Sequence, residues 1–179
     1  MIEQDPKSPH CYLDKNFNFD GGCLLDAGTA EGNFALDVAE KADRLILVEG
    51  DESWNEALKK TFEPWREKVV IINKYLSDVE GERAVTIDSI SKDYKIDFIK
   101  MDIEGAEVAA LRGGHEFFCN TKKLKMAICA YHNLDDENKI RDVLSEFNFE
   151  VNAVPGLMVF PDNIFQSPRL VRGVLRVQR

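Results

Sequence analysis

Polar residues follow several apolar runs of this sequence, at the points where strands would end. They are Asp26, Glu49, Asn73, Asp102 and His132. An open parallel sheet builds its site at the carboxyl ends of its strands, so we expect these side chains to lie along one edge. Carboxylates and an imidazole gathered there could exchange a proton, hold a cation or bind the hydroxyls of a ribose.

The segment Asp97–Leu111 (DFIKMDIEGAEVAAL) holds a pair of acids that could act on a substrate. Asp102 ends a predicted strand, and Glu104 follows two residues later. Carboxylates this close can share a proton, bind a cation or take a proton from a hydroxyl. Glu107 falls in the first turn of a predicted helix, where an acid commonly stabilises free backbone N–H groups. We therefore interpret Asp102 as functional and Glu107 as structural.

A second segment, Ala130–Asn133 (AYHN), follows the next predicted strand. Near a carboxylate, His132 could act as a general base at neutral pH, so Asp102 and His132 both stay open as the base. Asp102, His132 and Asn133 could instead ligate a divalent ion that lowers the pKa of a substrate hydroxyl. The ordinary alternative is a surface histidine in a loop. His10 and His115 stand alone and are assigned no role.

The stretch Cys23–Gly32 (CLLDAGTAEG) reads as a strand and a glycine turn, and a helix follows it. Gly28 lets the backbone approach a ligand closely, and Gly32 lets helix and strand begin close together. The turn lacks the middle glycine of a dinucleotide-binding loop and carries Glu31, which would repel a pyrophosphate. Glu49 lies about 20 residues beyond the first glycine, where an acid can bind both ribose hydroxyls. These features favour S-adenosylmethionine (SAM) over NAD.

Strands and helices alternate along most of the chain, which predicts an α/β fold with a mostly parallel sheet. Ser53 is a plausible N-cap, with Glu56 three residues later. The last two strands are joined without a helix, by a loop over 155–168, so they can pair antiparallel. The predicted strands are 23–25, 44–49, 69–73, 96–102, 124–130, 149–154 and 169–177, and the predicted helices are 33–41, 53–62, 106–111 and 135–147.

The composition is that of a globular protein, with 179 residues, 44% of them hydrophobic. We expect an N-terminal arm over 1–21, partly ordered, and a single domain over 22–179. A net charge of −9 argues against a nucleic-acid partner, because contacts to phosphate groups need clustered Lys and Arg. The cysteines show no paired spacing, and no signal peptide or membrane-length apolar run is visible, so we expect a cytoplasmic protein.

Taken in order, several segments resemble those of FkbM-type SAM-dependent methyltransferases. The similar region runs from about Tyr12 to Phe147, and the run KMDIEGAE with LRGG behind it is its most specific part. These segments are DAGTAEGNFAL, LILVEGDE, TIDSI, DFIKMDIEGAEVAALRGG and the strand ending in AYH.

The resemblance implies a class I methyltransferase fold, a Rossmann-like three-layer sandwich with an antiparallel C-terminal hairpin. It also implies in-line O-methylation of a small-molecule hydroxyl, on a sugar or natural product. The methionine part of SAM would lie along Asp26, Gly28, Thr29 and Gly32, the ribose on Glu49, and the adenine beside Lys74, Tyr75 and Leu76; Asp102, Glu104 and His132 would face the methyl donor.

Two other functions stay open at this point. A SAM-binding fold that no longer catalyses could serve as an interaction module, but such a module does not need Glu49, Asp102 and His132 together. An NAD-binding oxidoreductase is disfavoured by the glycine turn. The sequence does not name the methyl acceptor, and a divalent metal and a homodimer stay open.

Overall fold

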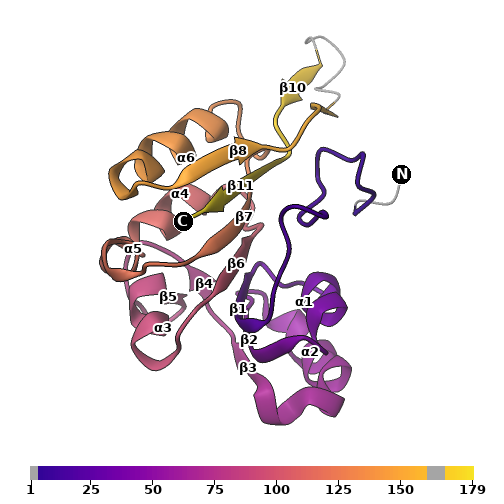
Figure 1. Ribbon diagram of the computed structural model, residues 1–179. Helices are drawn as coiled ribbons and strands as arrows, with labels where there is room; N and C mark the ends of the chain where they lie inside the picture. The colour runs from indigo at the N-terminus through magenta and orange to yellow at the C-terminus, as the bar shows by residue number, and fades with distance from the viewer. Residues whose placement is uncertain (1–3, 161–167) are drawn as a thin grey trace.

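A seven-stranded sheet forms the centre of the computed structural model, which describes residues 4–160 and 168–179 (Figure 1). Its strand order is β3-β2-β1-β6-β7-β11-β8. The first five strands in this order run parallel, and β11 runs antiparallel to both β7 and β8. The strands are β1 (Gly22–Ala27), β2 (Ala42–Val48), β3 (Val69–Ile72), β6 (Phe98–Met101), β7 (Lys125–Cys129), β8 (Glu150–Ala153) and β11 (Val174–Gln178).

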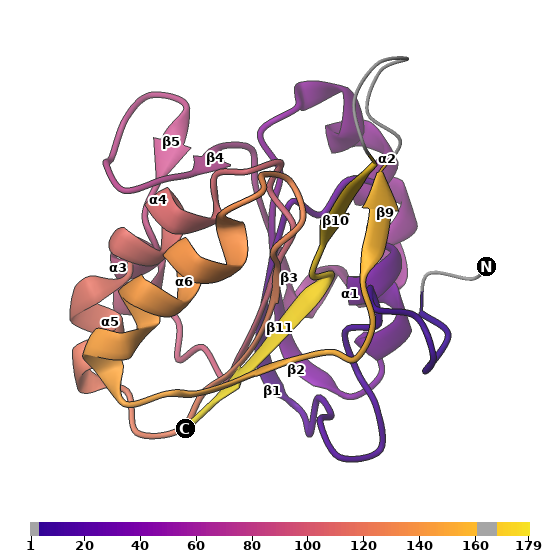
Figure 2. The same ribbon diagram turned by 90° about the horizontal axis from the view of Figure 1, so that it is seen from above.

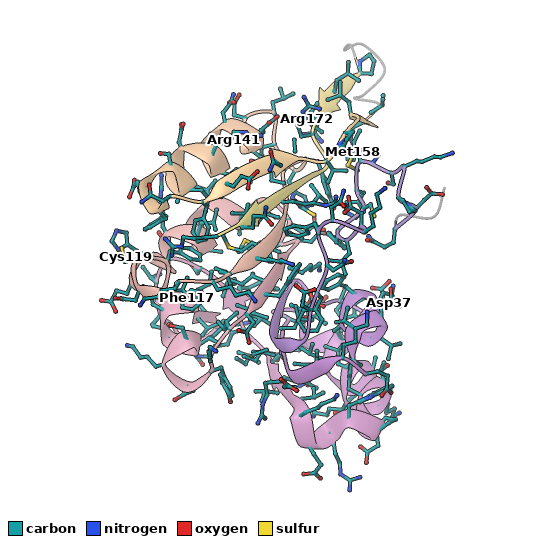
Figure 3. The ribbon with its side chains drawn as sticks, viewed as in Figure 1. Asp37, Phe117, Cys119, Arg141, Met158 and Arg172 are labelled. Atoms are coloured by element: carbon teal, nitrogen blue, oxygen red, sulfur yellow. The ribbon has the colours of Figure 1, made fainter. Side chains whose placement is uncertain are left out.

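The central strands are apolar on both faces because helices cover both sides of the sheet. Figure 2 shows α1 and α2 on one side and α3 to α6 on the other. In Figure 3, Asp37 on α1 and Cys119 on α5 mark these two sides. The helices are α1 (Asn33–Val38), α2 (Asn55–Thr61), α3 (Ile87–Asp93), α4 (Glu107–Arg112), α5 (His115–Asn120) and α6 (Asp136–Leu144), with short 3₁₀ helices η1 (Glu52–Trp54), η2 (Glu63–Lys68) and η3 (Ser145–Phe147).

This architecture confirms the predicted three-layer α/β fold and the antiparallel strands at its C-terminal end. Each face of the sheet has its own buried core. Phe34 and Leu58 pack on one face of the sheet, and Ile90, Leu111 and Ile140 pack on the other. Among the described residues, no helix is both long and apolar enough to cross a membrane.

The C-terminal part differs in detail from the expectation. The predicted strand 169–177 is two strands, β10 (Arg169–Val171) and β11, and β10 pairs antiparallel with β9 (Met158–Phe160), inside the predicted loop. The break falls at Gly173, where a Cβ would lie 2.0 Å from the Pro9 carbonyl oxygen, so the N-terminal arm passes directly against it. Residues 161–167 of that predicted loop lie outside the described part of the chain. A further parallel pair joins β4 (Tyr75–Leu76) to β5 (Ala84–Val85).

The predicted cap at Ser53 is wrong. The Asp51 carboxylate accepts a hydrogen bond from the Ser53 N–H at 2.9 Å and caps η1, and α2 begins only at Asn55. An aspartate in extended conformation can reach an N–H two residues ahead, so it takes the capping role from the serine.

The N-terminal arm packs against the sheet over its described part, 4–21 (indigo in Figure 1). Phe17 and Phe19 are buried, and both rings meet Phe98 of β6 edge-on. Arg176 of β11 donates hydrogen bonds to the Cys11 and Tyr12 carbonyls and pairs with Asp14. Aromatic burial and one arginine thus hold the arm on the side of the sheet that α1 covers.

We expect Arg176→Ala to destabilise the protein by about 2–3 kcal/mol, because it leaves two carbonyls and a carboxylate without their donor. Urea unfolding measures this change. Arg172→Ala is the matched control, since Arg172 is 39% exposed and pairs with Glu137; it should cost less than about 1 kcal/mol. Equal effects of the two substitutions would contradict this account of the arm.

Candidate active site

The turn after β1 lies directly against the end of β6. Gly28 has a φ of +69°, and a Cβ built there would lie 1.8 Å from the Asp102 carbonyl oxygen. Only glycine fits, because any side chain would meet backbone and would also strain the left-handed conformation. The structure places the neighbouring strand end against this glycine, which also lines two cavities, so its expected close approach to a ligand stays a prediction.

Glu49 joins the turns that follow β1 and β2. Its Oε2 accepts the Ala30 N–H at 2.9 Å, and its Oε1 accepts the Asp51 N–H at 2.8 Å. Asn73 holds the same corner through a 2.8 Å hydrogen bond from its amide to the Glu49 carbonyl. The side chain of Glu49 is therefore fixed at the carboxyl edge of the sheet.

A cavity of about 410 Å³ opens beside Glu49. This larger cavity extends from the ends of β2 and β3 to the end of β6, a distribution expected for a ligand at the edge of a parallel sheet. Its lining includes Gly28, Glu49, Trp54, Tyr75, Leu76, Asp102 and Glu104.

A smaller cavity of about 150 Å³ lies on the other side of the glycine turn. It shares Gly28, Ala30 and Asp102 with the larger cavity. Its other walls come from the N-terminal arm, α1 and β6, and include Tyr12, Thr29, Glu31, Asp37 and Lys100. Asp102 therefore borders both cavities.

The Asp102 carboxylate is the meeting point of the N-terminal arm and the segment after β7. Tyr12 donates a hydrogen bond to its Oδ2 at 3.0 Å, and Tyr131 donates to its Oδ1 at 3.0 Å. His132 Nε2 lies 3.3 Å from Oδ1, and His10 Nε2 lies 3.7 Å from Oδ2. Two segments far apart in the sequence thus orient one carboxylate.

The surroundings favour the charged form of Asp102. Burial opposes ionisation, but hydrogen bonds from His10 and His132 and the charge of Lys100 outweigh it and hold the pKa of this carboxyl well below its usual range. The side chain of Asp102 is 20% exposed, so a ligand in either cavity could contact this oriented anion.

His132 lies between two carboxylates, behind Asp102. Its Nδ1 is 3.2 Å from Oε1 of Glu107, which is buried and also accepts the Ile103 N–H. Burial alone would lower the pKa of His132, but hydrogen bonds to Asp102 and Glu107 raise it to about 10. Within the described part of the chain, His132 lines neither of these two cavities.

Most of the predicted site residues come together, but three besides His132 do not line either cavity. Asp26 is buried and pairs with Lys100 at 3.1 Å, and burial raises the pKa of its carboxyl. Gly32 allows α1 to start against the Phe62 ring, where a Cβ would lie 2.6 Å away. Asn133 donates its amide to Asp136 at 3.1 Å, so the set Asp102, His132 and Asn133 is not the one assembled.

Several functional candidates escape sequence reasoning. His10 was assigned no role, yet it contacts Asp102 and lies 3.2 Å from the Tyr131 hydroxyl. Glu107 lies in the first turn of α4 and accepts a backbone N–H, as its interpretation as a helix-terminal acid expects, but it also faces His132. The alternation of His10 and Tyr12 in the N-terminal arm was the available signal, because alternate residues of an extended segment lie on one side. Without the fold, this pattern does not identify Asp102 as their common partner. Lys100 gave no signal beyond a charge within an apolar strand.

The comparison with family models identifies the family of this chain. Residues 2–151 match the methyltransferase FkbM domain. The chain belongs to the FkbM methyltransferase family. The resemblance to the FkbM-type SAM-dependent methyltransferases that was inferred from the sequence motifs is confirmed. The sequence finds no match among curated proteins.

Solved structures share the class I methyltransferase fold with this FkbM protein. The precorrin-6y C5,15-methyltransferase of Geobacter metallireducens has a TM-score of 0.59 at 10% identity, with 90% of this chain and 80% of that chain covered. A putative methyltransferase from Streptococcus mutans, solved with SAH, has a TM-score of 0.53 at 14% identity, with 88% of each chain covered. A SAM-dependent O-methyltransferase from Thermotoga maritima has a TM-score of 0.54 at 13% identity, with 87% of this chain and 58% of that chain covered.

Gly28→Ala should destabilise this methyltransferase by at least about 2 kcal/mol, because the new Cβ meets backbone and φ is positive. Urea unfolding measures the change, and titration with SAH reports the damage to the site. The control is Gly81→Ala, whose Cβ would make an ordinary 3.6 Å contact with Ala84; we expect a change within about 1 kcal/mol. A Gly28→Ala variant as stable as Gly81→Ala would refute the close approach.

Proposed function

We propose that this chain binds SAM in the larger cavity and transfers its methyl group to a hydroxyl of a small molecule, such as a sugar or a natural product. The observation that carries the proposal is the position of Asp102. Its carboxylate is held by hydrogen bonds from Tyr12 and Tyr131 and borders both cavities. A reacting hydroxyl needs an oriented acceptor for its proton beside the methyl donor, and Asp102 is placed to provide one.

The walls of the larger cavity suit the adenosine part of SAM. Glu49 at the end of β2 would accept the ribose hydroxyls, and Trp54, Tyr75 and Leu76 would border the adenine. Gly28 and Thr29 would lie near the methionine part. This placement matches the expectation from the family motifs, except that Asp26 and Gly32 act through the fold and not by direct contact.

In the proposed reaction, the hydroxyl oxygen attacks the methyl carbon as the bond from carbon to the sulfonium sulfur breaks. The sulfonium already makes this methyl group reactive, so the protein mainly orients the hydroxyl and removes its proton. We assign the proton acceptor to Asp102. His132 lies behind it and would fix its orientation, together with Tyr12 and Tyr131.

The charge of the chain supports a small acceptor over a nucleic acid. The net charge is −9, and Glu31 and Asp37 add carboxylates to the wall of the smaller cavity. Phosphate groups would be repelled there, since nucleic-acid binding depends on clustered Lys and Arg. One structural neighbour is a putative RNA methyltransferase from Pyrococcus horikoshii, but at 14% identity it informs the fold alone.

The two tryptophans allow a direct test of the cofactor site. Trp54 lines the larger cavity, whereas Trp65 donates to Glu40 away from it, so SAH should change the fluorescence of wild type and of Trp65→Phe but not of Trp54→Phe. With this signal, Glu49→Gln should weaken SAH binding tenfold or more, since a hydrogen bond to a charged group is worth about 1.5–3 kcal/mol.

The control for that titration is Glu52→Gln, an exposed acid of η1 that is outside the cavity lining. It should bind SAH as wild type does. Equal affinity in Glu49→Gln and wild type would contradict the ribose assignment, and NADH binding in place of SAH would favour the oxidoreductase alternative.

Asp102→Asn should reduce methyl transfer at least about 100-fold while leaving SAH affinity within about threefold, because it removes the proton acceptor but keeps the side-chain shape. Transfer of radiolabelled methyl from SAM to a panel of sugar and polyketide hydroxyls measures this. Asp93→Asn, at the exposed end of α3, is the control.

Unchanged turnover in Asp102→Asn would refute the assignment of the base. If wild type binds SAH but methylates no member of the panel, the non-catalytic interaction module becomes the better reading of the fold.

A further inference from the structure

Three metal-ligating side chains lie together behind the wall that separates the two cavities. One ligand atom from each of Asp102, Glu107 and His132 lies within 4.8 Å of the other two. The two ring nitrogens of His132 face different carboxylates: Nε2 is 3.3 Å from Asp102 Oδ1, and Nδ1 is 3.2 Å from Glu107 Oε1. Only one of these nitrogens would be a ligand of a given ion. Two of these residues precede or begin α4, and the third follows β7, so the parallel pairing of β6 and β7 brings them together.

The surroundings of Glu107 favour a cation in this cluster. Its side chain is 1% exposed, and its Oε1 accepts the Ile103 N–H at 2.9 Å. Its Oε2 is buried without a hydrogen-bond partner. A buried carboxylate oxygen that lacks a partner carries a large desolvation cost, which a bound cation would offset.

We propose that Asp102, Glu107 and His132 form a binding site for a divalent first-row transition metal ion. Two carboxylate oxygens and one imidazole nitrogen suit Mn²⁺ or Zn²⁺, whereas Ca²⁺ prefers oxygen ligands alone. Three protein ligands leave coordination positions open, as catalytic sites do. Because Asp102 borders both cavities, the open positions would lie toward them.

The ion would complement the acceptor side of the site by lowering the pKa of a bound hydroxyl. This role rests on the proposed methyl transfer, but the binding of the ion does not. The sequence suggested a metal through Asn133, which is turned to Asp136; Glu107 supplies the third ligand instead.

A second group of potential ligands, His10, Asp102 and Cys129, lies on the other side of Asp102. We favour the Glu107 group, because His10 Nε2 already lies 3.2–3.3 Å from the hydroxyls of Tyr12 and Tyr131. A thiol is also a poor ligand for Mn²⁺. Binding at the second group is therefore an outcome that the test must distinguish.

The test is titration of the chelator-treated full chain with MnCl₂, followed by electron paramagnetic resonance of the free ion. We expect one Mn²⁺ per chain, and binding at least tenfold weaker in Glu107→Gln and in His132→Gln. Asp135→Asn, an exposed acid three residues after His132, is the matched control and should bind within twofold of wild type.

A second measurement needs no variant that might fail to fold. The chain has three histidines. In histidine-labelled wild type, ZnCl₂ should shift the imidazole nitrogen signals of His132 and leave those of His115 on α5 unchanged. Shifts centred on His10 would place the ion at the second group and overturn the proposal.

No binding of either ion below millimolar concentration would also overturn it, as would wild-type affinity in both Gln variants. In that case the three residues would form only an ion-paired group, with a charged His132 between the carboxylates of Asp102 and Glu107. SAH titration of wild type separates the two proposals. A wild-type chain that binds SAH but no metal ion contradicts only the metal site, and one that binds the metal ion but no SAH contradicts only the proposed function.

Discussion

The carboxylate of Asp102 imposes the constraint on which the rest of the site depends. It is held as an anion at the edge of the sheet with only 20% of its side chain exposed. A buried carboxylate costs several kcal/mol unless donors surround it, and β6 itself supplies none of the hydroxyl or imidazole groups that do so. The donors Tyr12 and Tyr131 come from the N-terminal arm and from the segment after β7, so both must converge on one point.

This convergence explains features that seem unrelated to function. Arg176 on β11 fastens the arm through Cys11 and Tyr12, which keeps the Tyr12 hydroxyl on Asp102. Gly173 lets the arm cross β11 at close range, and Gly28 lets the β1 turn reach the backbone of Asp102. Each is a close backbone approach that a Cβ would block, so the packing of the scaffold and the geometry of the site are set by the same residues.

The site also divides its tasks among strand ends. The turns after β1 and β2 form the larger cavity around Glu49, and their contacts are backbone hydrogen bonds that fix one carboxylate. The segments after β6 and β7, with the arm, form the acidic and imidazole cluster around Asp102. In this FkbM family member, the proposed methyl donor and the proposed chemistry therefore meet at Asp102, which borders both cavities.

The sequence by itself determined the layered fold, the strand ends that carry Glu49 and Asp102, and the family, because periodicity and glycine spacing are local properties of the chain. It could not find His10, Tyr12 or Tyr131 as partners of Asp102, or Glu107 as a partner of His132. It also placed Asp26 and Gly32 at the cofactor, whereas the first is buried with Lys100 and the second faces Phe62. These assignments depend on which side chains meet across the arm, β6 and β7. Such contacts are long-range, and only the tertiary structure decides them, since the cost of burying a charge is met by whichever donors the fold brings close.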